Sequence, residues 1–433
     1  MAYRVGLIGL GTVGAGSAKT LLQNADQITK RAGTDVVLYA AADLDLTTDR
    51  GVDLSKVKTT TDGWEIINDP EVDCVVELIG GDTIAKEFVI GALNNKKDVV
   101  TANKALLATH GAELFKLAED NQRKIYFEGA VGGGIPIIQS LYGGLASAKI
   151  DEIYAIINGT SNYILTTMEE ANRPFDVVLK EAQELGYAEL DPTYDVEGND
   201  AAHKITLLAS ICFGTEVKLS DVYTQGIGNI TVEDIEYGRK LGYCLKLLAV
   251  AKDLGGEVDV RVHPTFIPES HLLASVKGVF NAVCTYADGL GMTVEYGRGA
   301  GDKPTGHAVI SDVIQCALDA QARRPVDYSN FYTPAKPLRA MSEVASEYYL
   351  RFLVKEKPGV FAKIANELAE RGISILSVLQ LESANAQQCP VVIMTHHAKE
   401  GDIMQALKKI DALDVVLAPP TVIRIADLND VKA

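Results

Sequence analysis

The sequence contains few of the residues that build disulfide frameworks or zinc sites, and it has no segment suited to crossing a membrane. It holds six cysteines in 433 residues, and none of them forms a CxxC pair. Neither a zinc site nor a disulfide scaffold is therefore indicated, and we expect reduced thiols. No apolar run reaches the length of a bilayer span, and the N-terminus enters a strand pattern without a charged, cleavable leader. We expect a cytoplasmic protein with no membrane partner.

Basic residues are also scarce relative to acidic ones. The chain has 41 lysines and arginines against 58 aspartates and glutamates, a net charge of −17. This balance argues against a nucleic-acid partner or an anionic membrane surface. The apolar fraction of 47% and the charged fraction of 23% are typical of globular proteins, and the length allows two or three domains. A small, partly cationic ligand suits this composition better than a polyanion.

A glycine-rich turn follows the first strand pattern. Residues 3–14 read YRVGLIGLGTVG, and helical spacing follows them. Gly9, Gly11 and Gly14, with Thr12 and Val13 between the last two, form the GxGxxG fingerprint of dinucleotide-binding folds. The glycines permit a tight turn and close approach to a pyrophosphate at the helix N-terminus. The flanking strand and helix make the motif more specific than the three glycines alone.

Asp43 ends the next apolar run, residues 36–42. An acidic side chain at this place typically binds the adenosine ribose hydroxyls. No arginine stands in the usual position for reading a ribose phosphate, which favours NAD over NADP. The alternative is a turn role for Asp43, because Asp45 and Asp49 follow closely.

The alternation of strand and helix patterns continues to residue 127. A buried-strand pattern at 72–79 ends in Gly80, and a second at 98–101 runs toward Lys104. Repeated units of this kind predict a parallel sheet with helices on both faces. Ligands of such sheets bind beyond the carboxyl ends of the strands, so we expect Gly80 and Lys104 near the cofactor.

A second glycine-rich segment, residues 127–136, reads FEGAVGGGIP and contains Glu128. One interpretation is a site for a hard cation, formed by a carboxylate and backbone carbonyls. The other is a flexible hinge between domains. The residues alone favour the hinge.

An acidic stretch at residues 186–204 ends in a lysine. Asp200 and Lys204 are four residues apart in a helical pattern, so their side chains leave the same face and can meet. Crowded carboxylates raise one another's pKa unless a cation lies among them, and the ammonium group of a ligand is such a cation. A lysine with a lowered pKa can manage the proton that accompanies hydride transfer to a nicotinamide, and Lys104 and Lys204 are the two candidates. The alternative is a solvated helix start, where acidic residues suit the helix dipole.

We expect three α/β units. They are a Rossmann-type parallel-sheet domain at 1–135, completed by a helix at about 302–323; an α+β substrate and dimerisation domain at 136–301; and, after a proline-rich linker at 324–346, a βαββαβ ferredoxin-like module at 347–428.

Six motifs, spread over essentially the whole chain, resemble those of monofunctional homoserine dehydrogenases that end in an ACT domain. They are GLIGLGTVG from Gly6, TANKALL from Thr101, EGAVGGGIPI from Glu128, NGTSNYIL from Asn158, GYAELDPTYDVEGNDAAHK from Gly186 and GRGAGDKPT from Gly297.

The resemblance implies a reversible oxidation of L-homoserine to L-aspartate 4-semialdehyde with NAD or NADP, in threonine and methionine biosynthesis. It implies that Lys204 is the proton donor and acceptor and that Lys104 assists at the reacting oxygen. It places these further residues: Glu189, Asp200, Thr160, Gly159 and Asp195 on the substrate; Gly186 and Gly301 in the cofactor cleft; and Glu128, with the carbonyls of Val131, Gly133 and Ile135, on a sodium ion, which replaces the hinge interpretation. Members of the family often carry arginine where Ala41, Ala42 and Asp43 stand here, which favours NAD.

The ACT resemblance implies control by an amino acid, with L-threonine as the expected effector, and assembly into a homodimer or homotetramer. A purely structural module that binds no effector is the alternative. Two other functions compete with the whole assignment. An aspartate-semialdehyde dehydrogenase needs a thiolate nucleophile, and no cysteine here stands beside a histidine. A non-catalytic nucleotide and amino-acid sensor would not need both lysines.

Overall fold

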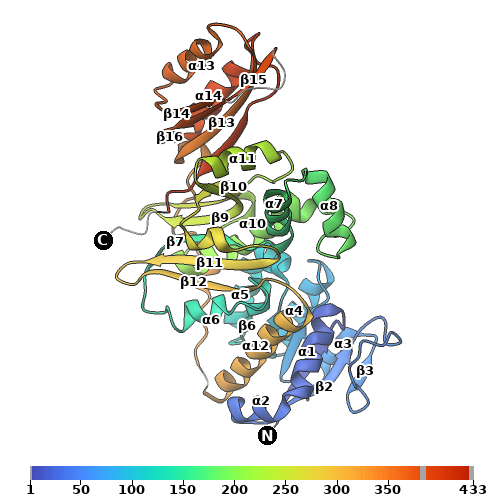
Figure 1. Ribbon diagram of the computed structural model, residues 1–433. Coiled ribbons are helices and arrows are strands. Elements are labelled where there is room, and N and C mark those ends of the chain that lie inside the picture. Colours follow the sequence, from blue (N-terminus) through green and yellow to red (C-terminus); the bar gives the residue numbers. More distant parts are fainter. Residues whose placement is uncertain (1, 323, 381–386, 429–433) are drawn as a thin grey trace.

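The computed structural model describes residues 2–322, 324–380 and 387–428. Figure 1 shows three regions stacked along the long axis: the N-terminal sheet at the bottom, a mixed α+β region in the middle and the C-terminal module at the top. The three kinds of fold predicted from the sequence are all present.

The N-terminal region is a six-stranded parallel sheet in the order β3-β2-β1-β4-β5-β6. Every residue of β4 and β5 is buried, as expected for a sheet covered on both faces. The elements are β1 (Tyr3–Ile8), α1 (Thr12–Gln23), α2 (Ala25–Ala32), β2 (Val36–Ala42), β3 (Lys58–Thr60), α3 (Gly63–Asn68), β4 (Cys74–Glu77), α4 (Ile84–Asn94), β5 (Asp98–Thr101), α5 (Lys104–Asp120) and β6 (Ile125–Tyr126).

A helix from far along the chain packs against this region. Helix α12 (Asp302–Ala322) lies against α1, and Figure 1 shows the two side by side. A Cβ atom at Gly306 would lie 2.7 Å from the carbonyl carbon of Gly16, and one at Gly16 would lie 2.2 Å from the carbonyl oxygen of Asp302, so the close approach of the two helices requires glycine at both positions. Residue 323, the last of the predicted helix, lies outside the described residues.

The middle region is built on antiparallel strands. They occupy one part of an eleven-stranded sheet whose order is β12-β11-β7-β9-β10-β17-β13-β15-β14, with β8 beside β10. The elements are η1 (Glu128–Ala130), α6 (Ile137–Tyr142), β7 (Ile150–Ile156), α7 (Gly159–Ala171), α8 (Phe175–Glu184), α9 (Thr193–Val196), α10 (Asn199–Phe213), η2 (Leu219–Asp221), β8 (Tyr223–Thr224), α11 (Val232–Lys240), β9 (Tyr243–Asp253), β10 (Val258–Pro268), η3 (Leu272–Ser275), β11 (Phe280–Ala287) and β12 (Gly291–Arg298).

The C-terminal module supplies the other part of that sheet. Its strands run β17-β13-β15-β14, which is the order of a ferredoxin-like βαββαβ unit, and helices α13 and α14 pack on each other. The elements are β13 (Ala345–Lys355), α13 (Val360–Ala369), β14 (Ile375–Gln380), β15 (Gln388–Thr395), β16 (Ala398–Lys399), α14 (Glu400–Asp411) and β17 (Thr421–Ile425). Residues 381–386 and 429–433 lie outside the described residues.

Two connections join the module to the rest of the chain. Strand β17 pairs in parallel with β10 through Thr265 with Arg424 and Phe266 with Ile425. The stretch predicted as a linker contains two short 3-10 turns, η4 (Ser329–Phe331) and η5 (Met341–Glu343). It is not fully exposed, because Phe331 is buried and its ring stacks on that of Phe115 at 4.0 Å between centroids.

Candidate active site

A cavity of about 510 Å³ lies between the carboxyl ends of the parallel strands and the middle region. Residues from the turns after β1 and β5, from the starts of α5 and α7, and from α10 converge on it. The predicted site residues that line it are Val13, Lys104, Gly133, Gly159, Thr160, Gly186, Asp195, Asp200, Lys204 and Gly301.

Lys204 is held deep in this cavity by two acceptors. Its Nζ donates to Oδ2 of Asp200 at 2.6 Å and to the carbonyl oxygen of Ile157 at 2.7 Å. Both Asp200 and Lys204 lie on α10, so the predicted meeting of residues four apart is confirmed. Oδ1 of Asp200 lies 3.2 Å from Nζ of Lys104, at the start of α5. One carboxylate therefore binds both candidate lysines, which are a hundred positions apart in the sequence.

Burial and charge act on these groups in opposite directions. Burial lowers the pKa of Lys204, Asp200 opposes that effect, and the charge of Lys104 adds to it, so that the pKa of Lys204 is below its ordinary value. Burial raises the pKa of Asp200, but Lys204 and Lys104 outweigh burial and hold this pKa at about 2. Asp200 is therefore a carboxylate at neutral pH, while Lys204 releases its proton more readily than a surface lysine.

Asn158 connects the acidic groups, and the sequence did not identify it as a site residue. Its Nδ2 donates to Oδ1 of Asp195 at 2.7 Å and to Oδ2 of Asp200 at 2.8 Å. Its Oδ1 accepts the backbone N–H of Ser161 at 2.7 Å and caps α7. An asparagine at an N-cap uses only its side-chain oxygen for the cap. Its amide nitrogen remains free to bind another group, and this was the signal in the sequence that could have identified Asn158 as a site residue.

The acidic stretch divides into an inward and an outward part. Asp200 is buried and Asp195 is half-buried, and burial raises the pKa of Asp195. Glu189 is exposed and is not among the residues that line the cavity. Thr160 on the cavity wall donates through Oγ1 to the carbonyl oxygen of Tyr187 at 2.6 Å. The solvated-helix interpretation fits Glu189 but not the two aspartates.

The glycine turn leaves the N-terminus of α1 open. A Cβ atom at Gly14 would lie 1.9 Å from the carbonyl oxygen of Gly9, so only glycine allows this turn to close. A Cβ atom at Gly11 would meet nothing within 4 Å, and no side chain of the described residues caps the helix start. Free amide groups at a helix N-terminus suit a pyrophosphate. Gly9 and Thr12 belong to the same turn, and Gly80 is exposed after β4.

Asp43 has a basic neighbour that the sequence analysis overlooked. Its Oδ2 accepts the backbone N–H of Leu10 at 2.6 Å, which ties it to the glycine turn. Nη2 of Arg50 lies 3.2 Å from Oδ1 of Asp43. The expectation of no arginine near the ribose position was therefore incomplete, because Arg50 reaches back across seven residues to this carboxylate.

Glu128 is buried and caps α6. Its Oε1 accepts the N–H of Ile138 at 2.9 Å and its Oε2 the N–H of Gln139 at 2.7 Å. The N–H of Glu128 in turn donates to Oδ2 of Asp312 at 2.7 Å. Burial raises the pKa of Glu128 to about 7 and that of Asp312 well above its ordinary value. No lysine or arginine in the described part of the chain is found to act on either carboxyl group. Two buried carboxyl groups, one of which contacts the backbone of the other residue, fit a bound cation, and the carbonyls of Val131, Gly133 and Ile135 belong to the same buried segment.

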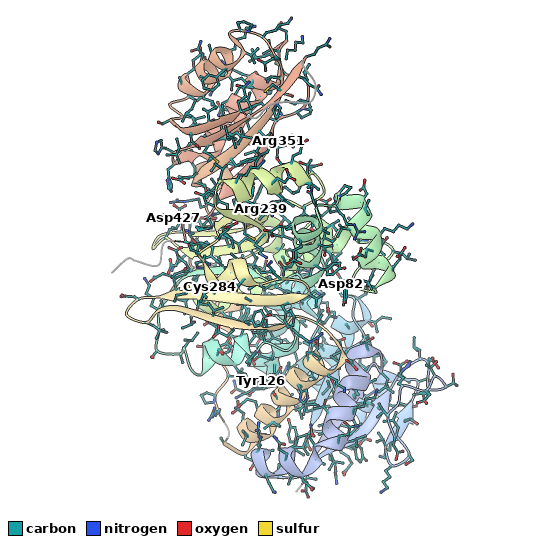
Figure 2. The ribbon with its side chains drawn as sticks, in the orientation of Figure 1. Asp82, Tyr126, Arg239, Cys284, Arg351 and Asp427 are labelled. Atoms are coloured by element: carbon teal, nitrogen blue, oxygen red, sulfur yellow. The ribbon has the colours of Figure 1, made fainter. Side chains whose placement is uncertain are left out.

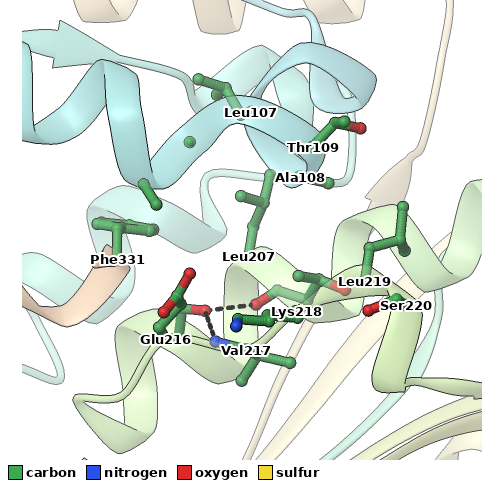
Figure 3. A pocket seen from close by; sticks show the side chains of 14 residues that line it. Leu107, Ala108, Thr109, Leu207, Glu216, Val217, Lys218, Leu219, Ser220 and Phe331 are labelled. Atoms are coloured by element: carbon green, nitrogen blue, oxygen red, sulfur yellow. Dashed lines mark hydrogen bonds between the residues drawn. The ribbon is translucent and has the colours of Figure 1, made fainter. Parts of the chain in front are cut away.

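A second cavity, of about 520 Å³, lies between α5, α10 and the segment 216–220 (Figure 3). Its wall is largely aliphatic, with Leu107, Leu207 and Phe331 facing inward. The hydroxyl of Ser210 accepts the N–H of Val217 at 3.2 Å. None of the predicted site residues lines this cavity, so it is separate from the site above.

The chain matches three family models in sequence order. Residues 9–128 match the NAD binding domain of homoserine dehydrogenase, residues 136–314 match homoserine dehydrogenase itself, and residues 348–412 match the ACT domain. A homoserine dehydrogenase of Neisseria gonorrhoeae is 46% identical over 98% of this chain and 99% of its own. The chain belongs to the homoserine dehydrogenase family. One from Bacillus subtilis is 43% identical over 96% of each chain.

Solved structures of the family agree. The crystal structure of a homoserine dehydrogenase from Thiobacillus denitrificans superposes with a TM-score of 0.94, at 42% identity and 99% coverage of both chains. A hyperthermophilic archaeal homoserine dehydrogenase in complex with NADPH has a TM-score of 0.62, at 26% identity, over 75% of this chain and 99% of its own.

Family membership makes this chain an oxidoreductase that uses a nicotinamide cofactor. The ACT match indicates regulation by an amino acid. Neither alternative function is favoured. The six cysteines are free thiols that do not line the cavity, which leaves an aspartate-semialdehyde dehydrogenase without its nucleophile there. The full-length matches to homoserine dehydrogenases disfavour a non-catalytic sensor. Within the described residues, no helix combines the length and hydropathy of a bilayer span.

Proposed function

We propose that the protein oxidises L-homoserine reversibly to L-aspartate 4-semialdehyde in the 510 Å³ cavity, with Lys204 as the proton donor and acceptor. The observation that carries this proposal is the cluster of Lys204, Lys104 and Asp200 in one buried space beside the glycine turn. An outward-facing acidic mouth would have offered no such place for a reaction.

The proton step follows from the environment of Lys204. In the oxidative direction its amine must be uncharged to take the hydroxyl proton of the substrate, and burial moves its pKa in that direction. A nicotinamide held beside the glycine turn would supply the hydride acceptor for the carbon that bears this hydroxyl, so that its C–O single bond would become a carbonyl. Lys104 stays close through Asp200 and offers a positive charge to the reacting oxygen.

Substrate binding uses the inward carboxylates. Asp200 and Asp195 receive the amino group of homoserine, and Asn158 fixes both carboxylates by one amide nitrogen. Gly159 and Thr160 form the adjoining wall. We keep Glu189 as a substrate contact, which requires its exposed loop to fold over the cavity mouth when the substrate binds.

The cofactor would be held by the glycine turn, formed by Gly9, Gly11, Thr12, Val13 and Gly14, and by Gly80, Lys104, Gly186 and Gly301 along the rest of the cleft. Asp43 binds the ribose hydroxyls of NAD, which remains the favoured cofactor. The ion pair of Arg50 with Asp43 also supplies a cation for the extra phosphate of NADP. The chain therefore accepts both cofactors, with NAD preferred.

A sodium ion binds Glu128 together with the carbonyls of Val131, Gly133 and Ile135. The support is the pair of buried carboxyl groups, Glu128 and Asp312, which lack a basic partner among the described residues. The ion neutralises this acidic pair and fixes the segment that leads from the Rossmann sheet to α6.

The proposed domains are a cofactor-binding domain at 1–135 completed by 302–323, a substrate-binding and dimerisation domain at 136–301, and an ACT domain at 347–428. A linker at 324–346 precedes the ACT domain. The ACT domain is a regulatory domain for L-threonine in a cytoplasmic homodimer or homotetramer. A threonine titration of the rate, compared with a chain ending near Arg339, tests the regulatory part.

The central test is the initial rate with L-homoserine against NAD and NADP in parallel, for the wild type, Lys204→Ala and Lys104→Ala. We expect Lys204→Ala to lower kcat by about 10² to 10⁴, the usual contribution of a general base. Lys104→Ala should lower it less and raise KM. Turnover of Lys204→Ala at the wild-type rate contradicts the assignment.

A further inference from the structure

A third cavity, of about 120 Å³, lies where the C-terminal module meets the middle region. Strands β9 and β10 contribute Lys252, Arg261 and His263 to its wall, and the C-terminal module contributes Ser346, His397 and Arg424. No residue of this wall lines the candidate active site. The cavity is small, polar and rich in nitrogen donors.

Two guanidinium groups dominate the wall, and both are nine-tenths or more buried. Arg424 is 2% exposed; it donates to both oxygens of Glu400 and, through Nη1, to Oε1 of Gln225 at 2.7 Å. Arg261 is 8% exposed and donates through Nε to Nε2 of His263 at 3.0 Å. Its Nη1 forms an ion pair with Asp259 but makes no hydrogen bond to any of the described residues. Arg261 thus keeps an unsatisfied donor in a buried place, where an unpaired donor is costly.

The acidic partners of these cations are not among the residues that line the cavity. Glu400 pairs with Arg424, Asp259 with Arg261, and Glu152 with Lys252 at 2.9 Å, and none of the three acids lines the cavity. Asp427, labelled in Figure 2, is the acidic residue among the described residues of the wall.

Burial and the positive charges in the cavity wall lower the pKa values of Arg261 and His263. Burial lowers the pKa of Arg261 to about 10, and the nearby charge of Arg424 acts in the same direction. Burial and the two arginines together hold the pKa of His263 well below its ordinary value, so His263 is neutral and accepts from Arg261. The cavity therefore presents two like-charged guanidinium groups, Arg261 and Arg424, whose acidic partners are not among its lining residues.

We propose that this cavity binds a small anion with a compact oxyanion head, a phosphate or a carboxylate, placed between Arg261 and Arg424. Planar guanidinium groups bind such heads through paired, charge-assisted hydrogen bonds. His397, which is exposed, adds an imidazole from the C-terminal module, and Ser346, whose hydroxyl donates to the carbonyl oxygen of Ile425 at 2.8 Å, adds a hydroxyl oxygen. The bound anion bridges that module and the catalytic sheet.

The site is connected to Lys204 by short segments. Tyr154 of the wall lies on β7, and Ile157, which follows β7, provides the carbonyl that holds Lys204. On the other side, Gln225 binds Arg424, and a Cβ atom at Gly226 would lie 2.4 Å from the carbonyl oxygen of Val196, just before α10. The cavity wall thus includes a residue of the strand that precedes Ile157, and it is linked through Gln225 and Gly226 to the segment before α10.

The test uses the full-length protein with saturating NAD, so that the pyrophosphate site is filled. Inorganic phosphate and acetate are titrated separately by calorimetry into the wild type and three variants. Arg261→Met removes the main donor. Ala345→Asp places a carboxylate on the exposed rim of the cavity without disturbing the core, and Ala345→Asn is its uncharged match. Circular dichroism confirms folding of each variant.

We expect saturable binding of phosphate, acetate or both to the wild type and to Ala345→Asn. Binding should weaken at least about tenfold in Arg261→Met, the effect of losing one charge-assisted hydrogen bond, and by at least about tenfold in Ala345→Asp, whose carboxylate repels the anion. Binding of phosphate alone identifies a phosphate head group, and binding of acetate identifies a carboxylate. Absence of saturable binding of either anion overturns the proposal, as does wild-type affinity in Ala345→Asp. None of these readouts depends on turnover of homoserine.

Discussion

Replacing Asp200 by asparagine should move the pH profile of homoserine oxidation toward lower pH. The carboxylate is the main group that raises the pKa of Lys204, against burial and Lys104, which lower it. Asparagine has the same shape and can still accept from Lys204 and Asn158 through its oxygen, so packing is preserved. The negative charge is lost, as is the oxygen that faces Lys104, and the pKa of Lys204 then falls further.

The size of the shift follows from the contact itself. A hydrogen bond to a charged partner contributes about 1.5 to 3 kcal/mol, and one pKa unit corresponds to about 1.36 kcal/mol. The 2.6 Å contact of Lys204 with Asp200 therefore supports a shift of roughly one to two units. Oxidation requires the uncharged amine, so the rate rises with pH through this pKa. The rising limb of Asp200→Asn should lie roughly one to two units below that of the wild type.

The assay is kcat at saturating homoserine and cofactor across pH, followed by absorbance of the reduced nicotinamide. Saturation separates the proton step from weaker substrate binding, which should raise KM in the same variant. Asp195→Asn is the matched control, because Asp195 raises the pKa of Lys204 less than Asp200 does, and its limb should move less. An unchanged limb in Asp200→Asn, or one displaced to higher pH, would refute Lys204 as the titrating base.

Three further predictions concern the cofactor, the buried acids and the helix contact. Arg50→Met should lower kcat/KM with NADP by about tenfold to a hundredfold and leave NAD almost unchanged, and an equal loss with both cofactors would argue against a phosphate contact. Glu128 has a folded-state pKa of about 7 against an ordinary 4.5, so without sodium its contribution to stability is present below pH 4.5 and is lost as the pH rises through about 7. That loss of stability amounts to roughly 3 kcal/mol. Added sodium should reverse the loss, and Glu128→Gln should abolish its pH dependence. An unfolding free energy that responds neither to sodium nor to Glu128→Gln would exclude the ion. Gly306→Ala should reduce the unfolding free energy by about 1 to 3 kcal/mol in denaturant titrations, because its methyl group meets the backbone of Gly16, and wild-type stability would mean that α12 shifts without cost.

The sequence predicted those features that rest on local spacing. The four-residue separation of Asp200 and Lys204 became a direct contact, and the glycine turn between β1 and α1 has the predicted form. Alternating patterns predicted the parallel sheet and the ferredoxin-like order of the C-terminal strands.

Contacts between distant or irregular segments carried no such signal. The bridge from Asn158 to Asp195 and Asp200 spans about forty residues, and the return of Arg50 to Asp43 runs through a turn without periodicity. Glu128 showed its acidity in the sequence but not its burial or its neighbour Asp312, 184 positions away. Such pairs are chosen by the tertiary fold, which hydrophobic spacing does not encode.

The pairing of β10 with β17 makes the C-terminal module a structural cap as well as a regulatory unit. A chain shortened before residue 345 would expose the backbone groups of β10 around Thr265 and Phe266 as an unprotected sheet edge, which invites aggregation. Loss of activity after such a truncation would then report self-association of the remaining enzyme, and only a measurement of particle size would distinguish it from a lost regulatory signal.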